Sequence, residues 1–229
     1  MTDRPLALIT GATRGIGAAT AEALADTHDL LLGGRDVDAL KEMASRLRSA
    51  RPWPVELTDP SALAAATAGI HRLDVLVHSA GISRLGGLGD MRVADWRESY
   101  ELNVVAVAEL TRLLLPSLRA AAGHVVLINS GSGLKANPKW GAYAASKFAL
   151  RAYGDVLRAE EEPNGLRVTS VHPGRTATDM QRDVREFEGG EYVPEQYMAP
   201  SSVAGVIKAA IDTPRDAHVH EIVIRQPNR

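Results

Sequence analysis

A tyrosine and a lysine lie four residues apart in the stretch WGAYAASKFAL, which otherwise consists mainly of small and apolar residues. On a helix this spacing places Tyr143 and Lys147 on one face, so the ammonium group can lie close to the phenol. A nearby cation stabilises phenolate and lowers the pKa of tyrosine from its reference value of about 10. Ser130 ends a β-branched run shortly before this helix and could bring a hydroxyl beside the phenol. These residue types predict an acid-base site around one reacting carbonyl oxygen.

A glycine-rich turn follows the first apolar run of the chain. The segment TGATRGIG, Thr10 to Gly17, leads directly into the helix-forming run AATAEALA. Its Gly-x-x-x-Gly-x-Gly spacing lets backbone approach a pyrophosphate, whose charge is favoured by the free N–H groups of a helix N-terminus. A plain tight turn is the alternative, but the position between a first strand and a first helix favours a dinucleotide site.

The end of the second expected strand bears on which dinucleotide binds. A site for NAD usually places a carboxylate there for the ribose 2′-hydroxyl, whereas a 2′-phosphate favours arginine. Here Arg35 follows Gly34, and Asp36 fits a helix cap. Arg14, inside the glycine turn, could approach the same phosphate. These residues favour NADP(H) over NAD(H), and two solvated surface arginines are the alternative.

Six motifs occur in an order that resembles the short-chain dehydrogenase/reductase family. They are the glycine turn, HSAG, LNV, INS, YAASK and HPG, and they cover roughly residues 5 to 175. The resemblance, of the Tyr-x-x-x-Lys type, implies an α/β Rossmann domain whose seven parallel strands have the order 3-2-1-4-5-6-7, with helices on both faces. It also implies an oxidoreductase that interconverts a carbonyl and an alcohol by hydride transfer.

The resemblance gives four polar residues catalytic roles. Tyr143 would donate or accept the proton, and Ser130 would orient and polarise the carbonyl. Lys147 would hold the nicotinamide ribose and lower the pKa of the tyrosine. Asn103, in ELNVV, would anchor a water that links Lys147 to solvent. Each residue taken singly is more often structural, but the four together at the family's spacing favour catalysis.

The resemblance also places a cofactor along the strand ends. Glu56 and Leu57 would lie near the adenine, and Pro173 and Gly174 would flank the nicotinamide. In HSAG, two residues replace the asparagines usual in the family. The predicted cofactor-binding set is Gly11, Thr13, Arg14, Gly15, Ile16, Gly17, Arg35, Glu56, Leu57, Ser79, Ala80, Gly81, Tyr143, Lys147, Pro173, Gly174, Thr176 and Thr178.

The elements that must position these residues alternate along the chain. Short β-branched or leucine-rich runs alternate with longer amphipathic stretches, which predicts βαβ units and a doubly wound, mostly parallel sheet. Strands are expected at 6–10, 30–34, 53–57, 74–80, 124–130, 167–173 and 221–225. Helices are expected at 16–27, 36–50, 60–70, 95–121, 142–161 and 201–212. No linker interrupts the alternation, so one domain is expected over 1–229, with a mobile substrate lid at about 176–200.

Composition limits the other possibilities. A chain of 229 residues with 45% apolar content can bury one substantial core. The net charge of −2, with scattered lysines and arginines, excludes the basic stripe that nucleic acid requires. There is no cysteine, which suits a reducing cytosol, and the first residues lack both a signal-peptide core and a membrane span. We expect a cytoplasmic protein with no membrane partner.

The substrate and the assembly are less constrained. Five residues could line an apolar pocket for a bulky ketone or aldehyde, or could pack the lid against the body: Leu134, Trp140, Met180, Phe187 and Tyr192. By analogy with the family, helices 95–121 and 142–161 would form a homodimer or homotetramer, with contributions from Phe148, Leu150 and Leu157.

Other functions fit less well. His218 and His220 alternate on one strand face, but no third ligand stands at the right spacing, so no metal site is expected. The remaining histidines considered, which we expect at the surface or at strand ends, are His71, His78, His124 and His172. An epimerase or dehydratase would need a larger C-terminal domain. A non-enzymatic NADP(H)-sensing or scaffold protein would keep the glycine turn but need not keep Ser130, Tyr143 and Lys147.

Overall fold

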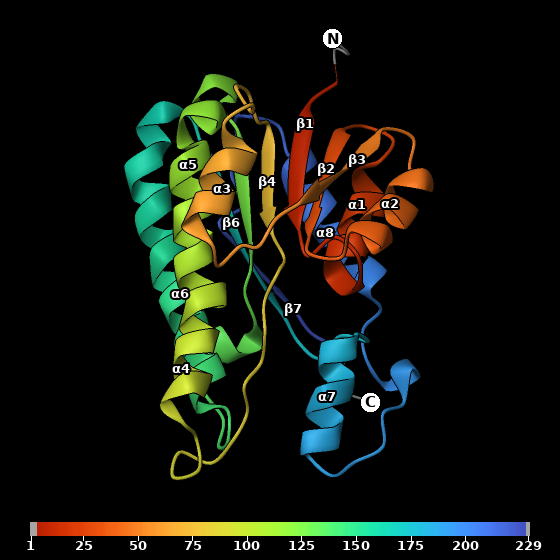
Figure 1. The fold of residues 1–229 in the computed structure, drawn as a ribbon, viewed down its shortest axis with the longest axis vertical. Coiled ribbons are helices and arrows are strands. Elements are labelled where there is room, and N and C mark those ends of the chain that lie inside the picture. Colours follow the sequence, from red (N-terminus) through yellow and green to blue (C-terminus); the bar gives the residue numbers. More distant parts are fainter. Residues whose placement is uncertain (1–3, 228–229) are drawn as a thin grey trace.

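A computed structural model describes residues 4–227 and has a single β-sheet at its centre (Figure 1). The strands in that range are β1 (Leu6–Thr10), β2 (Asp29–Gly34), β3 (Ala50–Pro54), β4 (Val75–His78), β5 (His124–Ile128), β6 (Arg167–Pro173) and β7 (Glu221–Ile224). Neighbouring strands all pair in parallel, in the order β3-β2-β1-β4-β5-β6-β7. The predicted fold class and strand order are confirmed. The first three and last two residues of the predicted domain lie outside the described residues.

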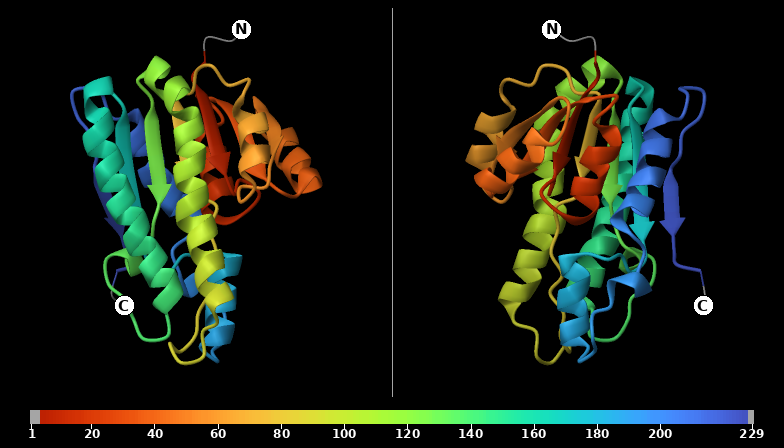
Figure 2. Two further views of the ribbon diagram at one scale, coloured as in Figure 1. Left: turned by 60° about the vertical axis from the view of Figure 1, so that its left-hand side comes forward. Right: turned by 90° about the vertical axis from the view of Figure 1, so that its right-hand side faces the viewer.

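Helices cover both faces of this sheet (Figure 2). Their bounds are α1 (Gly15–Leu24), α2 (Val37–Ser45), α3 (Pro60–Thr67), α4 (Val93–Tyr100), α5 (Ala106–Ala121), α6 (Gly141–Glu161), α7 (Asp179–Phe187) and α8 (Pro200–Asp212). One apolar core joins the sheet to α1, α2 and α8, and the other joins it to α3, α5 and α6. Among the helices of the described chain, none is long and apolar enough to cross a bilayer.

The strands consist of apolar runs because both of their faces are covered. In β1, Ala7 and Ile9 point into the core beneath α1 and α8, whereas Leu8 points into the core beneath α5. All three side chains are fully buried. The carboxylates of Asp36 and Asp59 accept hydrogen bonds from the first-turn N–H groups of α2 and α3, which confirms both predicted caps.

Three predicted elements differ clearly from the observed bounds. The predicted helix 95–121 is interrupted by a π-helical turn at Glu101–Val105, which separates α4 from α5. β3 begins and ends three residues before the predicted 53–57, and the preceding helix ends at Ser45 rather than at 50. Pro54 already pairs with Gly34, the last residue of β2, so residues beyond Pro54 have no strand left to pair with. The remaining predicted elements overlap the observed ones.

The segment 176–200 is more regular than its sequence suggests. It contains α7 and a 3₁₀ turn at Pro194–Gln196, and it projects beyond the carboxyl ends of the strands (Figure 1). Its two ends are tied together, because the N–H of Ala177 donates to the carbonyl of Met198 at 2.8 Å. Val184 and Gln181 form the buried side of α7. Mobility of this segment remains a prediction.

Three histidines are buried rather than exposed, but His78 ends β4 and His124 begins β5, so the strand-end alternative is confirmed for these two. His78 and His124 each hydrogen-bond a threonine hydroxyl on a neighbouring element, and His172 lies 3.1 Å from the carbonyl oxygen of Ser130. Burial lowers the pKa of both His78 and His124 to about 3. These neutral rings therefore belong to the packed interior. His71 is exposed, as expected.

The predicted oligomer contacts also need correction. Leu150 and Leu157 are buried within their own chain, in the core beneath α5 and α6, so they are not available to a second subunit. Phe148 remains 41% exposed on α6. The sequence of an amphipathic helix does not show whether a leucine packs within its own chain or against a second subunit.

Candidate active site

A cleft of about 1920 Å³ lies at the carboxyl ends of the strands. Its walls come from the segments that follow each of β1 to β6, together with the start of α7. The strand order reverses between β1 and β4, and parallel α/β sheets bind ligands in the crevice outside such a switch point. Of the predicted cofactor residues, every one except Gly17 lines this cleft.

The glycine turn is shaped by close backbone contacts. Gly11 has a φ of +65°, and a Cβ on it would lie 2.9 Å from the backbone nitrogen of Ala80. Gly17 lies beneath the turn, where a Cβ would overlap the carbonyl oxygen of Gly11. Arg14 occupies the N-cap position of α1 without a capping hydrogen bond from its side chain. The first N–H groups of α1 are therefore not capped by a side chain and suit an anion.

Ser130, Tyr143 and Lys147 are brought together on the other side of β4 from this turn. β5 ends just before Ser130, whereas the tyrosine and the lysine come from α6. The hydroxyl of Ser130 hydrogen-bonds the phenol of Tyr143. Lys147 Nζ lies 5.8 Å from the centroid of the tyrosine ring and donates to the carbonyl of Ile128 at 2.9 Å. Both α6 side chains are buried although they line the cleft.

Burial dominates the protonation of this pair. It raises the pKa of Tyr143 above its usual value, and the hydrogen bond from Ser130 offsets this only in part. Burial lowers the pKa of Lys147 to about 8. The expected lowering of the tyrosine pKa by Lys147 is not found, because the ammonium group lies over the ring and donates to Ile128. Tyr143 is therefore a protonated phenol at neutral pH.

Asn103 lies in the π-helical turn between α4 and α5 and does not line the cleft. Its Oδ1 accepts from the N–H of Ile82, while its Nδ2 donates to the carbonyl of Ile82 and to the hydroxyl of Ser146, each at 3.0 Å. Both amide protons of Asn103 are thus used within the protein. The side chain of Asn103 thus connects the segment after β4 to α6, where its partner Ser146 directly precedes Lys147.

The HSAG motif lacks the asparagines usual in the family, and its hydrogen bonds are made with two threonine side chains on other elements. The backbone N–H groups of Ser79 and Ala80 both donate to the hydroxyl of Thr10, at the end of β1. The ring of His78 hydrogen-bonds Thr111 on α5. Thr10 was not singled out by the sequence, although its position directly before the glycine turn could have indicated it.

The two arginines considered for a 2′-phosphate each face a carboxylate. Arg35 lies 3.5 Å from Glu56, and Arg14 lies 3.3 Å from Asp179 at the start of α7. All four side chains are exposed at the cleft, and such pairs contribute little to stability. A guanidinium has five N–H donors, so one carboxylate leaves capacity for a phosphate.

The predicted substrate wall is only partly formed. Trp140 and Met180 line the cleft, and the indole lies 5.9 Å from the ring of Tyr143. Leu134 and Tyr192 do not line it, and Tyr192 stacks on Tyr197 instead. Phe187 belongs to a separate pocket of about 390 Å³. The sequence could not tell which of these residues line the cleft, because it does not indicate the direction of their side chains. The fold was needed for that distinction.

Two further cleft residues were missed from sequence. The side chain of Asn129 accepts from the N–H of Ser130 at 2.8 Å and donates to the carbonyl of Lys147 at 3.1 Å, so it links the loop to α6. Its place in the INS motif was the available signal. Gln181 is buried on α7 in the cleft wall, and its Nε2 has no hydrogen-bond partner within the described chain. Nothing in its local sequence indicated this.

Elsewhere, the two histidines considered as metal ligands have other contacts. The rings of His218 and His220 meet edge-on, with centroids 4.5 Å apart. His218 Nε2 lies 2.9 Å from the backbone nitrogen of Val168. The absence of a metal site remains a prediction.

The fold and the cleft define a class: an α/β protein with a dinucleotide-type glycine turn and a serine–tyrosine–lysine site at the same sheet edge. A sequence profile described as short chain dehydrogenase matches residues 5–189. The chain therefore belongs to the short-chain dehydrogenase family of oxidoreductases.

Individual relatives support this membership. Dehydrogenase/reductase SDR family member 7B from Mus musculus is 37% identical over 199 residues, which cover 81% of this chain and 62% of the relative. Glycine betaine reductase ATRR from Emericella nidulans is 34% identical over 96% of this chain, but the match covers 18% of that protein. The chain thus spans less than two thirds of the length of both relatives. An alcohol dehydrogenase from Thermococcus sibiricus, complexed with 5-hydroxy-NADP, has a TM-score of 0.89 and 25% identity, with 99% of this chain and all of that chain covered.

Proposed function

We propose that this protein is an NADP(H)-dependent oxidoreductase that interconverts a ketone or aldehyde and the corresponding alcohol. One observation carries the proposal: the Ser130–Tyr143 hydrogen bond and the Lys147 ammonium group lie in the same cleft as the glycine turn. A hydroxyl pair beside a cation suits an oxygen that gains charge during reaction. The glycine turn suits the cofactor that exchanges the hydride.

The residues present fit a nicotinamide dinucleotide. The glycine turn brings backbone close to the cleft, and the N-terminus of α1 lacks a side-chain cap. The buried Nε2 of Gln181 is a donor without an acceptor, as expected where a polar ligand binds. We assign the pyrophosphate to the glycine turn, and the nicotinamide to the walls formed by Pro173, Gly174 and Lys147. The similar Thermococcus enzyme carries 5-hydroxy-NADP.

NADP(H) rather than NAD(H) is proposed on the basis of charge. The side chain of Asp36 is used as the cap of α2, where its Oδ1 accepts from two backbone N–H groups. Arg35 and Arg14 are the cations on that side of the cleft, and their carboxylate partners are exposed. A 2′-phosphate carries more charge than one carboxylate and can displace Glu56 or Asp179 from its arginine.

The chain's own groups account for the proton chemistry. The bound cofactor would supply or accept the hydride. In reduction, the carbonyl oxygen gains negative charge and receives hydrogen bonds from the hydroxyls of Ser130 and Tyr143. The Ser130 oxygen accepts from the N–H of Ser132 at 3.0 Å, and its O–H, which meets the Tyr143 phenol in the protein alone, would turn to the carbonyl oxygen when substrate binds. Tyr143 then transfers its proton to the alkoxide, and the hydrogen bond from Ser130 stabilises the resulting phenolate until solvent returns a proton. Oxidation runs these steps in reverse.

The raised pKa of Tyr143 favours one direction. A phenol that stays protonated at neutral pH is ready to act as the acid in reduction, whereas oxidation requires a phenolate. We therefore propose that reduction is the faster direction near neutral pH.

The substrate and the lid are proposed together. Trp140 gives the cleft an apolar wall near the phenol and Met180 adds apolar lining to the same cleft, which suits a carbonyl compound with a bulky apolar substituent. The segment 176–200 brings α7 to this cleft, and the Arg14–Asp179 ion pair connects it to the glycine turn. We propose that this segment closes over bound substrate, as active-site loops commonly do.

Assembly as a homodimer or homotetramer is proposed from the outer faces of the long helices. Phe148 and Val156 on α6, and Val105 beside α5, are large apolar side chains exposed at 41%, 55% and 48%. Sedimentation of the purified protein would measure its mass in solution, and a monomer at micromolar concentration would contradict the proposal.

One experiment tests the function directly. Purified protein is assayed against ketones, aldehydes and alcohols with NADPH or NADP⁺, following absorbance of the reduced nicotinamide. Cofactor binding is measured separately by fluorescence titration. We expect turnover of at least one carbonyl compound with NADPH. Tight binding of NADPH without turnover across the panel would instead favour a sensing or scaffold protein.

A further inference from the structure

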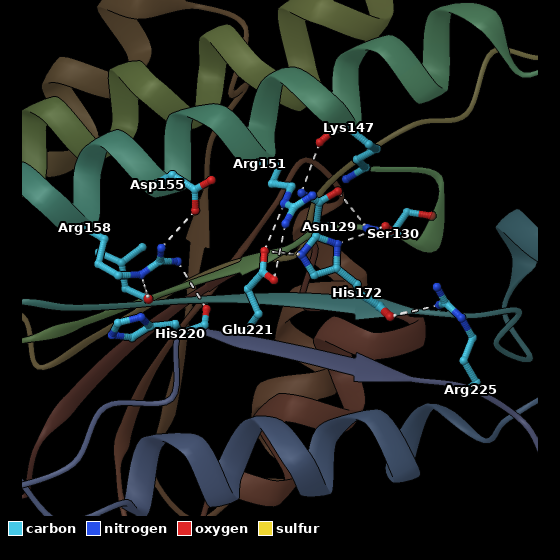
Figure 3. A network of polar contacts seen from close by, with 11 residues as sticks. Asn129, Ser130, Lys147, Arg151, Asp155, Arg158, His172, His220, Glu221 and Arg225 are labelled. Carbon is cyan, nitrogen blue, oxygen red and sulfur yellow. Dashed lines mark hydrogen bonds and ion pairs between the residues drawn. The ribbon is translucent and has the colours of Figure 1, made fainter. Parts of the chain in front are cut away.

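A polar network reaches the backbone of Ser130 from β6 and β7, and the proposed mechanism does not use it (Figure 3). Its centre is His172 on β6, whose side chain is fully buried. The ring's Nδ1 lies 3.1 Å from the carbonyl oxygen of Ser130, and its Nε2 lies 3.6 Å from a carboxylate oxygen of Glu221 on β7. Arg151 on α6 donates to both oxygens of that carboxylate, at 3.0 and 3.5 Å.

The contacts determine which ring nitrogen carries the proton. A carbonyl oxygen can only accept, so the contact with Ser130 requires a proton on Nδ1. Burial lowers the pKa of His172, and the cations of Arg151 and Arg225 act in the same direction, whereas Ser130 and Glu221 oppose it. The neutral ring therefore has Nδ1–H and an unprotonated Nε2, which finds no hydrogen-bond partner among residues 4–227.

Ser130 is held at each of its polar atoms. Its N–H donates to Asn129 Oδ1 at 2.8 Å, and its carbonyl accepts from the N–H of Gly133 at 3.0 Å as well as from His172. Its hydroxyl oxygen accepts from the N–H of Ser132. Of the groups that hold the serine, His172 is the one that comes from a different strand. Together with the bond from the N–H of Asn129 to the carbonyl of Val171 at 2.8 Å, it ties the loop after β5 to β6.

We propose that His172 is a positioning residue, whose Nδ1–H fixes the carbonyl of Ser130 and thereby the direction in which the serine hydroxyl meets the substrate oxygen. The Glu221–Arg151 ion pair packs behind the ring, and Arg225 donates to the backbone carbonyl of His172 at 3.2 Å. This inference rests on the proposed function of Ser130. Catalytic hydrogen bonds are sensitive to placement, so a loop shifted by less than an ångström changes turnover more than it changes cofactor binding.

Two amide variants separate the two ring nitrogens. The amide nitrogen of asparagine is as many bonds from Cβ as Nδ1 is, so His172→Asn can still donate to Ser130. The amide nitrogen of glutamine matches Nε2, so His172→Gln can reach towards Glu221 but not to the carbonyl. We expect His172→Asn to retain kcat within about twofold of wild type. His172→Gln and His172→Leu should lose roughly tenfold in kcat, the value of one lost hydrogen bond.

Each variant is also titrated with NADPH and melted thermally, to separate positioning from cofactor binding and from stability. Unchanged dissociation constants with the order Asn above Gln and Leu in kcat would support the proposal. Equal losses in the Asn and Gln variants, or a change confined to KM, would overturn it. If His172→Leu does not fold, the Asn and Gln pair still decides the outcome.

A second measurement does not depend on turnover. The ¹⁵N spectrum of histidine-labelled protein gives the tautomer of each ring, and the signal that disappears in His172→Asn belongs to His172. We expect a neutral ring protonated at Nδ1. Protonation at Nε2 would show that the bond to Ser130 is not made and would overturn the proposal. An inactive wild type would contradict the proposed function instead, and the tautomer would still report on His172.

Discussion

At the residue scale, the site depends on how burial and hydrogen bonding act on a phenol and an amine. Tyr143 and Lys147 are both buried, which disfavours the charged form of each: it raises the pKa of Tyr143 and lowers the pKa of Lys147 to about 8, so the two values move apart. Ser130 contributes a hydroxyl whose own oxygen is already occupied by the N–H of Ser132. A protonated phenol and a serine O–H are thus both available to one substrate oxygen.

Removal of the phenol oxygen tests this arrangement. Tyr143→Phe deletes the proton donor while keeping the ring, so kcat should fall by about 10²–10⁴, the usual contribution of a general acid. Steady-state reduction of a carbonyl substrate with NADPH measures the change. Tyr153→Phe is the matched control, since it removes a hydroxyl from the same helix outside the cleft. Near wild-type turnover in Tyr143→Phe would rule out the assignment.

Reversal of one charge tests cofactor choice. Arg35→Asp replaces a cation at the proposed 2′-phosphate position, so kcat/KM for NADPH relative to NADH should fall by roughly 10- to 100-fold, the value of one charge-assisted hydrogen bond. Arg48→Asp makes the same charge change at an exposed position that does not line the cleft. If wild type and Arg35→Asp prefer NADPH over NADH to the same degree, the 2′-phosphate is bound by other residues.

At the element scale, the strand-to-helix turn between β1 and α1 requires two backbones to approach closely. Gly17 packs against the carbonyl of Gly11, and Gly11 packs against Ala80 in the segment after β4. These contacts set where the N-terminus of α1 opens into the cleft. The π-helical turn that carries Asn103 likewise connects the segment after β4 to α6.

Adding a methyl group at Gly17 tests whether the close approach to Gly11 requires glycine. Gly17→Ala would force Gly11 and α1 to move, at a cost of about 1–3 kcal/mol in the free energy of unfolding. NADPH should also bind more weakly, because the helix N-terminus shifts. Chemical denaturation and a fluorescence titration measure the two effects. Gly69→Ala is the control, since a Cβ there meets nothing within 4 Å. Similar behaviour of both variants would contradict the close approach.

At the scale of the whole molecule, the sheet is held between two helical layers, and an ion pair between a half-exposed arginine and a buried glutamate links two helices of one layer. Arg119 of α5 donates to both carboxylate oxygens of Glu161 at the end of α6, at 2.8 and 2.6 Å. The glutamate is 3% exposed. Hydrogen bonding from Arg119 holds the pKa of Glu161 below its ordinary 4.5.

This pair should make stability depend on acid. Because the folded pKa of Glu161 is the lower one, its contribution is present in full above pH 4.5 and is lost as pH falls through the folded value. Melting temperatures from pH 7 down to pH 3 should therefore decline more steeply for wild type than for Glu161→Gln. The exposed Glu160→Gln should follow wild type. Parallel declines in all three proteins would show that the pair does not couple folding to pH.

The sequence by itself determined the layout of the molecule and the principal residues of the proposed site. Alternation of apolar runs with amphipathic stretches reports burial, which is a local property of composition, and it predicted the strands, their covered faces and most of the helices. The glycine turn was readable because close backbone approach excludes side chains. Tyr143 and Lys147 were readable because helical spacing alone puts them on one face.

The tertiary structure decided everything that depends on contacts between distant segments. It turned Leu150 and Leu157 inward, buried three histidines, and interrupted the long helix at Asn103. It also reversed the expected shift in the pKa of Tyr143, because desolvation depends on the neighbours that surround a group in three dimensions. The network from Arg151 through Glu221 and His172 to Ser130 joins α6, β7, β6 and the loop after β5, and no local pattern in the sequence encodes such a meeting.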